Sequence, residues 1–425
     1  MKLLVTGSPA CRRQLSNVPI ARTVSEVGDA FPVTTQDENP IDSQAAGDCL
    51  PDPRSLIEDT DWATLEHAYG PAQDTPLRLV QLLAEEPEVQ AEALGLLDMS
   101  VLHQESLYSA TAPAALFIAA ILDDPRTLAR HESYFPWDDR SRPLRAALLE
   151  WLGRVADSAA YGETAGANDG NDPGATDAVR AVRGPICRAV TAHLLAPDPS
   201  VREAALGATT ALLQAPDLAG RIATTQILRQ LLAESTDRRE RAATVLTIGS
   251  WGEDTTELLT DPDPAVRACA ALAPGCIGNA QATQAILHAL LEPATVDSWL
   301  PEPTAADPWI ADPLPQIEGR LRHALLSAAI ERTDDFEELL AVAVACVPFC
   351  SNLTIGDDWG PLLAAAFPSG YRLGAKLTPA QHRYLSALAD RDVCWRYTHL
   401  IASWFQDIGL PADRDAIKAL MGQAR

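Results

Sequence analysis

The segment of residues 195–214, LAPDPSVREAALGATTALLQ, constrains the fold more than any other part of the chain. Asp198 is followed by Pro199, and this order predicts a helix with an aspartate cap and a proline at its first position, where the missing N–H is not needed. From Val201 onward, apolar residues recur at the three- and four-residue spacing of one helical face. Most of them are alanines, so we expect a neighbouring helix to pack closely against this face.

The motif Asp-Pro-x-Val-Arg, which begins at Asp198, recurs at Asp263-Pro264-Ala265-Val266-Arg267, and looser copies begin near residues 89, 144 and 321. A helix of this kind cannot bury its apolar face alone, so stacked neighbours must cover it. The residues that we interpret as structural parts of the repeat are Asp198, Pro199, Val201 and Arg202 in one copy, and Asp263, Pro264, Val266 and Arg267 in the other. We expect Arg202 and Arg267 to pair with carboxylates of neighbouring repeats.

The Asp-Pro-x-Val-Arg opening resembles that of HEAT repeats, including the HEAT-like repeats named after phycobilisome lyases, over about residues 60–350. The resemblance implies an all-α fold, an armadillo-type α-solenoid of stacked antiparallel helix pairs, and a protein-binding surface. It implies no reaction, because one fold hosts many functions.

The first repeats are also similar to the opening of a group of bacterial HEAT-repeat proteins of actinobacterial type. This likeness rests on His67-Ala68-Tyr69-Gly70, on Asp74-Thr75-Pro76 and on the block of residues 103–111, in which Glu105 stands where the group leads us to expect glycine. Two interpretations of this region remain open. His67 and His103 are either buried residues that hold the first repeats together, or part of a polar site with Tyr69 and Tyr108.

Composition limits the partners and the compartment. The 425 residues carry a net charge of −25, with only three lysines, which argues against nucleic-acid binding and fits a basic protein partner. The eight cysteines are scattered without a C-x-x-C motif, so we expect a reducing compartment. The start of the chain lacks the apolar run of a signal peptide, and no apolar run is long enough to span a bilayer, so we predict a cytoplasmic protein without membrane contact.

We expect three regions: a disordered segment over residues 1–54, the solenoid over 55–350, and a C-terminal helical cap over 351–425. Acidic insertions near 156–177 and 293–318 are predicted to be loops, because the first is rich in Gly, Asn and Asp and the second in Pro. A helix is expected over 61–69 and a loop over 351–370. Aromatic residues in loops need burial or a partner, so the predicted partner contacts are Tyr134, Trp137, Trp299 and Trp309.

We find no motif for catalysis, a cofactor or a metal. The chain has no phosphate-binding loop, no nucleophile elbow and no H-E-x-x-H. Cys346 and Cys350 lie four residues apart on one predicted helix face, yet no histidine is near them, so we interpret them as core residues. Adjacent acids such as Asp138-Asp139 and Asp357-Asp358 are interpreted as helix caps or solvated loop residues.

These patterns predict a non-catalytic scaffold that binds another protein along its solenoid surface. One alternative is an acidic, immunity-type inhibitor of a basic toxin, and another is an enzyme of lyase or DNA-glycosylase type on the same scaffold. A groove that combines His, Asp and Arg would favour the enzyme, whereas a broad acidic face would favour the binder. A glycosylase would need a basic face, for which the candidates are Arg202, Arg229, Arg238, Arg239, Arg241 and Arg267.

Overall fold

The computed structural model describes residues 50–136, 138, 140–164, 173–214, 218–300, 314, 316–317 and 320–423. These belong to one compact unit, Leu50–Arg425. Nearly all of the predicted disordered segment lies outside the described residues, although helix α2 already begins at Pro53.

The described part of the chain is an all-α solenoid in which two short hairpins are the only strands. The first half contains α2 (Pro53–Glu58), β1 (Glu66–His67), β2 (Gly70–Pro71), α3 (Thr75–Gln81), α4 (Pro87–Val101), α5 (Thr111–Ala120), β3 (Arg130–His131), β4 (Arg142–Pro143), α6 (Leu144–Thr164), α7 (Pro173–Ala181), α8 (Arg183–Thr191) and α9 (Pro199–Leu212). The second half contains α10 (Leu218–Glu234), α11 (Arg238–Ser250), α12 (Pro264–Leu272), α13 (Ala280–Leu290), α14 (Pro293–Trp299), α15 (Leu321–Arg332), α16 (Phe336–Cys346), α17 (Trp359–Ala366), α18 (Pro379–Ala389), α19 (Thr398–Asp407) and α20 (Arg414–Gln423). Short 3₁₀ helices are η2 (His103–Glu105), η3 (Pro125–Leu128), η4 (Thr256–Thr260), η5 (Pro274–Cys276), η6 (Val347–Phe349) and η7 (Asp392–Trp395).

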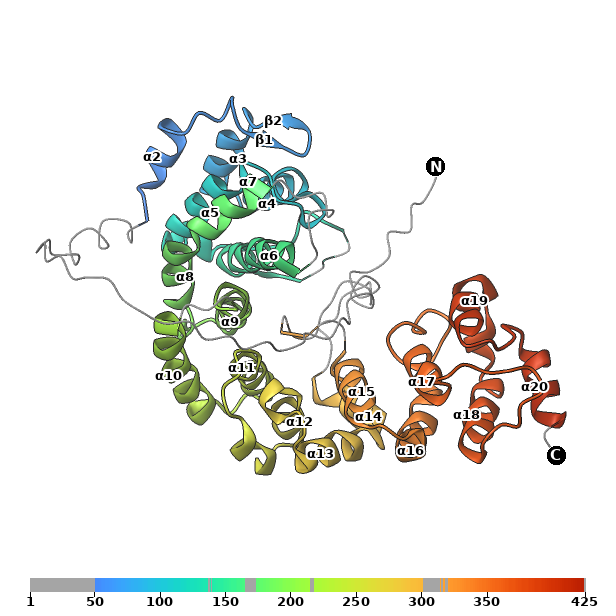
Figure 1. Cartoon of the computed structure of the whole chain (residues 1–425). Helices are drawn as coiled ribbons and strands as arrows, with labels where there is room; N and C mark the ends of the chain where they lie inside the picture. Colours follow the sequence, from blue (N-terminus) through green and yellow to red (C-terminus); the bar gives the residue numbers. More distant parts are fainter. Residues whose placement is uncertain are drawn as a thin grey trace, which may run out of the picture. The chain divides into compact units, whose positions relative to one another are not determined.

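The helices form two rows that follow the order of the chain. In one row, α4, α6, α9, α11, α12 and α15 each contact the next (Figure 1). The other row contains α5, α8, α10 and α13, which pack against the first row through the pairs α5–α6, α8–α9, α10–α11 and α12–α13. This two-layer stacking confirms the predicted α-solenoid.

Small side chains allow α6 and α9 to pack closely. Asp198 caps α9 by accepting hydrogen bonds from the backbone N–H groups of Ser200 and Val201, and Pro199 is the first helical residue. A Cβ atom on Gly153 of α6 would lie 3.1 Å from Cα of Ala208 in α9. The alanine-rich face therefore does what its composition predicts, because a larger side chain would push the two helices apart.

The arginine of the repeated Asp-Pro-x-Val-Arg motif stabilises the turn before its own helix. Nη1 of Arg202 donates to the carbonyls of Ala196 and Pro197 at 2.9 and 3.1 Å. Nη1 of Arg267 donates to the carbonyls of Asp261 and Pro262 at 2.6 and 3.0 Å. Nε of Arg202 also bonds Oε1 of Glu240 at 2.5 Å, and Glu240 belongs to α11, the next helix in the same row. For Arg267 the expected carboxylate partner was wrong, because its guanidinium bonds main-chain oxygens instead.

One predicted helix and one predicted loop were wrong, because contacts with distant residues decide the structure of both segments. Residues 61–69 contain β1 of a hairpin instead of a helix, and the backbone N–H groups of Ala68 and Ala110 bond the carbonyls of Ser100 and Glu66. The predicted loop over 351–370 contains α17, whose first residue, Trp359, is fully buried against Trp395.

The two acidic insertions are partly helical. α6 continues to Thr164 and α7 begins at Pro173, so helix occupies both ends of the first insertion. α14 begins at Pro293 in the second. The expectation that proline forbids a helix there was wrong. The N–H of the first helical residue has no acceptor within the helix, so a proline at this position removes no hydrogen bond.

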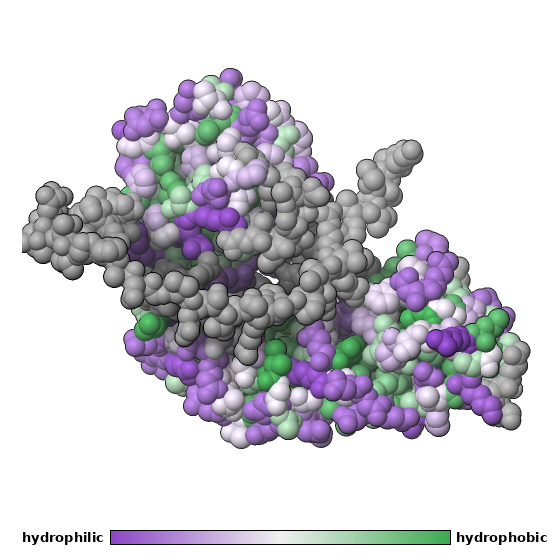
Figure 2. All heavy atoms as spheres, in the orientation of Figure 1, coloured by the Kyte–Doolittle hydropathy of each residue, from purple (hydrophilic) through white to green (hydrophobic). Residues whose placement is uncertain are grey.

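The surface of the described residues is polar with scattered apolar side chains. Figure 2 shows hydrophobic residues dispersed among hydrophilic ones on one face. Among the described helices, none has both the length and the apolar composition that a membrane crossing requires. Five cysteines in this part of the chain are buried free thiols: Cys269, Cys276, Cys346, Cys350 and Cys394.

A buried pair of charged groups lies among α15, α16 and α17. The side chains of Arg322 and Asp358 are 2% and 0% exposed, and their closest charged atoms are 3.9 Å apart. Asp358 caps α17 and accepts from the N–H of Trp359 at 2.6 Å. Burial raises the pKa of Asp358 to about 7, although the hydrogen bonds and Arg322 oppose this rise. Of the two interpretations of Asp358, the helix cap is correct, and the capping side chain is fully buried.

Asp358→Asn should change how stability depends on pH. Between about pH 4 and 7 the native carboxyl holds a proton that the unfolded chain releases, so this group makes the protein less stable as pH rises through that range, by roughly 4 kcal/mol at most. Asparagine also caps helices but does not titrate. Urea unfolding of both proteins at the two ends of this range should show the parent losing more stability than the variant. An equal change in both would contradict the raised pKa.

Gly153→Leu should destabilise the fold by about 1–3 kcal/mol, because the added side chain enters the tight contact between α6 and α9. The matched control is Gly184→Leu in α8, where a Cβ atom would meet nothing within 4 Å. Chemical denaturation followed by circular dichroism measures both changes. Equal free energies of unfolding for the two variants would show that the contact does not limit helix spacing.

Candidate functional site

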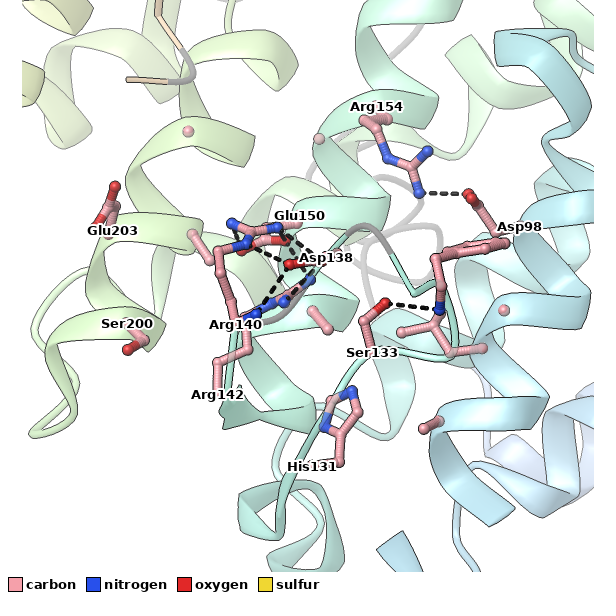
Figure 3. Close-up of a pocket in the computed structure, with 18 of the residues that line it drawn as sticks. Asp98, His131, Ser133, Asp138, Arg140, Arg142, Glu150, Arg154, Ser200 and Glu203 are labelled. Carbon is pink, nitrogen blue, oxygen red and sulfur yellow. Dashed lines mark hydrogen bonds and ion pairs between the residues drawn. The ribbon is translucent and has the colours of Figure 1, made fainter. Parts of the chain in front are cut away.

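A cavity among the described residues lies on the face of the first row of helices that points away from the second row. It has a volume of about 680 Å³ and is lined by α4, α6, α9, the start of α11 and the loop between β3 and β4 (Figure 3). α4, α6 and α9 each supply residues at three- and four-residue spacing, so one face of each of these helices is involved. We call this cavity the inner pocket. Its lining residues on the helices include Asp98 of α4, Glu150 and Arg154 of α6, Glu203 of α9 and Arg239 of α11.

The floor of the inner pocket consists of small residues. Gly153, Ala204, Gly207 and Ala208 lie between the charged side chains of α6 and α9. Tyr134, from the loop between β3 and β4, packs on Gly95, where a Cβ atom would lie 2.5 Å from the tyrosine ring. The small floor therefore leaves the cavity open, while the loop forms its other wall.

Two arginines and two carboxylates form a connected cluster at the centre of the pocket (Figure 3). Asp138 accepts from Nε of Arg140 at 2.8 Å and from Nη1 of Arg142 at 3.0 Å. Glu150 lies 2.9 Å from Nη2 of Arg142 and 3.3 Å from Nη2 of Arg140. Burial alone would raise the pKa of Asp138, but the hydrogen bond from Arg140 and the charges of both arginines lower it to about 2. Asp138 is thus a partly buried ion-pair residue, which corrects its interpretation as a cap or a solvated loop residue.

A further ion pair stands on each side of this cluster. Arg154 bonds Asp98 and also Glu105, the latter at 3.0 Å. Arg239 donates through Nε and Nη2 to the same oxygen of Glu203, at 2.8 and 2.5 Å. Charged side chains thus alternate in sign from α4 across to α11.

His131 lies beneath the cluster and is 6% exposed. Burial and the nearby charge of Arg142 lower its pKa to about 4, so the ring is neutral at neutral pH. The groove therefore combines His, Asp and Arg. A general acid or base works best with a pKa near the working pH, and the pKa values of His131 and Asp138 both lie well below neutrality. The arrangement is suited to recognition through hydrogen bonds and charge more than to proton transfer.

Backbone strain marks one edge of the pocket. Gln104 and Glu105 have φ angles of 52° and 59°, a left-handed conformation that residues other than glycine rarely adopt. Position 105 is the one at which the resemblance to bacterial HEAT proteins leads to an expectation of glycine, and the backbone there has the geometry that glycine suits. The glutamate that replaces it bonds Arg154 of the pocket. Strain of this kind persists where surrounding contacts over-determine it, often at functional sites.

The structure describes two of the four predicted partner-contact residues. Tyr134 lines the inner pocket and is 45% exposed. Trp299 ends α14 and is half-buried against the core. Trp137 and Trp309 lie outside the described residues.

The histidine and tyrosine residues of the first repeats are divided between the interior and the surface. His67 is buried, lies 3.0 Å from Asp74 through Nε2 and accepts from the N–H of Tyr69 through Nδ1. Tyr69 is exposed and packs beside His103 at 5.5 Å. Both ring nitrogens of His67 are therefore engaged in holding the hairpin of β1 and β2.

The arginines that a glycosylase would need are engaged elsewhere. Five of the six pair with carboxylates: Arg202 with Glu240, Arg229 with Glu257, Arg238 with Asp263, Arg239 with Glu203 and Arg241 with Asp261. The sixth, Arg267, bonds main-chain oxygens. These arginines do not form a free basic face.

Cys346 and Cys350 lie in the core. α16 ends at Cys346, and Cys350 follows η6, so the two do not share a helix. The thiol of Cys350 donates to the carbonyl of Cys346 at 3.3 Å. Burial raises the pKa of Cys346 to about 12 and that of Cys350 further. Among the described residues, no three His, Cys, Asp or Glu side chains are grouped to hold a metal ion.

Sequence reasoning missed most of the pocket because its residues come from four separate helices. It singled out Tyr134, and it considered Arg239 and Asp138 in other roles. The available signal was a charged residue beside a small one at three- or four-residue spacing, as in Glu203 with Gly207 and Glu150 with Gly153. This signal does not tell which helices are neighbours.

Comparison with known proteins agrees with the fold. Residues 225–298, which run from within α10 into α14, match the family model of HEAT repeats. No curated protein matches the sequence. The crystal structure of the Mot1 N-terminal domain in complex with TBP is similar at 10% identity and a TM-score of 0.22, over 92% of this chain and 68% of that chain. A TM-score this low supports no inference about function. The bacterial group indicated by the opening motif stays a prediction.

Glu105→Gly should leave the protein at least as stable as the parent. Glycine removes left-handed strain that costs about 1 kcal/mol or more, whereas the lost ion pair with the partly exposed Arg154 contributes less than about 1 kcal/mol. Glu105→Ala is the matched control, because it loses the same ion pair but keeps the strain. Unfolding in urea should rank the glycine variant above the alanine variant. The reverse order would mean that Glu105 is not strained.

Proposed function

We propose that this chain is a non-catalytic HEAT-repeat scaffold of the cytoplasm that binds another protein at the inner pocket. The observation that carries the proposal is the cavity of about 680 Å³ on the face of α4, α6, α9 and α11, with charged side chains of both signs around a floor of small residues. Such a face is broad, because consecutive repeats contribute to it, and stacked repeats commonly present extended binding surfaces of this kind.

Two further observations support a binder over an enzyme. The pKa values of His131 and Asp138 are too low for acid–base work at neutral pH. The arginines of the pocket are held by carboxylates, which fixes their positions in advance and lowers the cost of ordering them on binding. The net charge of −25 favours a basic partner through long-range attraction. An acidic inhibitor of a basic toxin is a specific form of this proposal.

The proposal is tested by photo-crosslinking from inside the pocket. Ser200, in the first turn of α9, lines the cavity. Replacing it with benzoylphenylalanine in cells that express the protein should yield one discrete adduct with another protein after irradiation. The matched control is Ser55, which lies exposed in the first turn of α2 behind the same kind of Asp-Pro start.

The same pair of positions serves for a blocking experiment. Ser200→Trp should abolish adduct formation from a crosslinker placed at Tyr134, whereas Ser55→Trp should leave it unchanged. Adducts that are identical from Ser200 and Ser55, or no adduct from the pocket, would contradict protein binding at this site.

A further inference from the structure

The inner pocket contains polar nitrogens, and also carboxylate oxygens, that make no hydrogen bond to the described residues. Three buried nitrogens of residues that line the pocket have no partner among the described residues: Nε of Arg142, Nη1 of Arg239 and Nδ1 of His131. They come from β4, α11 and β3, so three separate elements each bring one to the same cavity. The guanidinium nitrogens are donors only, and a buried donor without an acceptor costs about 1–3 kcal/mol. A ligand that supplies oxygen acceptors would recover this energy.

Carboxylate oxygens on the two sides of the pocket are also unused. Both bonds from Arg239 go to Oε1 of Glu203, and no described residue bonds Oε2. The bond from Arg154 likewise goes to Oδ1 of Asp98 and leaves Oδ2. Asp98 and Glu203 lie on opposite sides of the central cluster (Figure 3). These oxygens can accept from a cationic group.

The charge of the pocket decides which acceptor fits the donors. A phosphate or carboxylate would approach the arginines but would also meet Asp98, Asp138, Glu150 and Glu203, all of which line the cavity. Each arginine is already neutralised by one of these acids, so a further anion gains little attraction. A neutral acceptor avoids this repulsion, and the peptide carbonyl is the neutral acceptor that every protein partner carries.

We propose that the inner pocket binds an extended peptide segment of a partner protein that carries a lysine or arginine side chain, with a backbone carbonyl accepting from Arg239 and the cationic side chain bonding Glu203. The two contacts are adjacent, because Arg239 and Glu203 bond each other, and one residue of a peptide can supply both. Arg142 lies further along the same cavity and serves the next carbonyl. The volume of the pocket lies within the usual range for small ligands and short segments. This inference rests on the proposed function and specifies its ligand.

The test uses a fluorescein-labelled, acetylated and amidated peptide, Ala-Gly-Lys-Gly-Ala, and the full chain at about 0.15 M salt. Two companion peptides replace the lysine with norleucine or with glutamate. Fluorescence polarisation should show saturable binding of the lysine peptide and at least about tenfold weaker binding of the other two, which corresponds to about 1.4 kcal/mol. Equal binding of the norleucine peptide, or tighter binding of the glutamate peptide, would overturn the proposal.

General attraction to an acidic chain is separated from the pocket by a matched pair of variants. Glu203→Gln removes one charge inside the pocket, and Glu257→Gln removes one from an exposed pair with Arg229 outside it. We expect the first to weaken the lysine peptide about tenfold and the second less than about twofold. Equal losses would overturn the proposal, and circular dichroism melting of both variants verifies that each is folded.

The outcomes also separate this inference from the proposed function. An adduct from Ser200 together with no binding of the lysine peptide overturns only the choice of ligand. No adduct from the pocket, together with lysine-peptide binding that Glu203→Gln does not affect, overturns both. A peptide that carries its own photoreactive group should crosslink to one of the elements that line the pocket, and an adduct only on an element outside it would overturn the proposal.

Discussion

The close approach of α6 and α9 is the contact on which the pocket depends. Gly153 lies directly against the backbone of Ala208. The two helices are therefore closer to each other than they would be with leucine at these positions. Because the helices are close, the charged residues that flank this contact, Glu150 and Arg154 on α6 and Glu203 on α9, come within one cavity. The same small side chains provide its floor. Packing and binding capacity therefore arise from one choice of residue size.

The second constraint is the pairing of arginine with carboxylate along the first row of helices. A planar guanidinium has several donors in fixed directions, so one arginine can hold a neighbouring helix and its own turn at once, as Arg202 does. In the pocket the same chemistry fixes Arg142 and Arg239 in place while leaving single nitrogens unpaired. The chain has 33 arginines and lysines together, only three of them lysines, and this geometry explains how so much arginine is used without forming a basic surface.

Local signals predicted elements well where the chain interacts mainly with itself. The caps at Asp198 and Asp263 lie where the sequence indicates, because the cap bonds reach only two or three residues ahead. Prediction failed where distant contacts supply the bonds. The hairpin of β1 and β2 replaced a helix because Ser100 and Ala110 pair with its backbone, and α17 formed because Trp359 is buried by Trp395.

The sequence by itself determined the kind of fold, the caps and the close packing of the alanine-rich helices, since each depends on spacing within one segment. Only the tertiary structure decided that Asp98, Asp138, Glu203 and Arg239 share a cavity, and that the strained Glu105 bonds Arg154 at its edge. The physical reason is that a pocket across stacked helices is set by the register between helices. That register depends on the summed packing of many side chains, and no single stretch of sequence contains it.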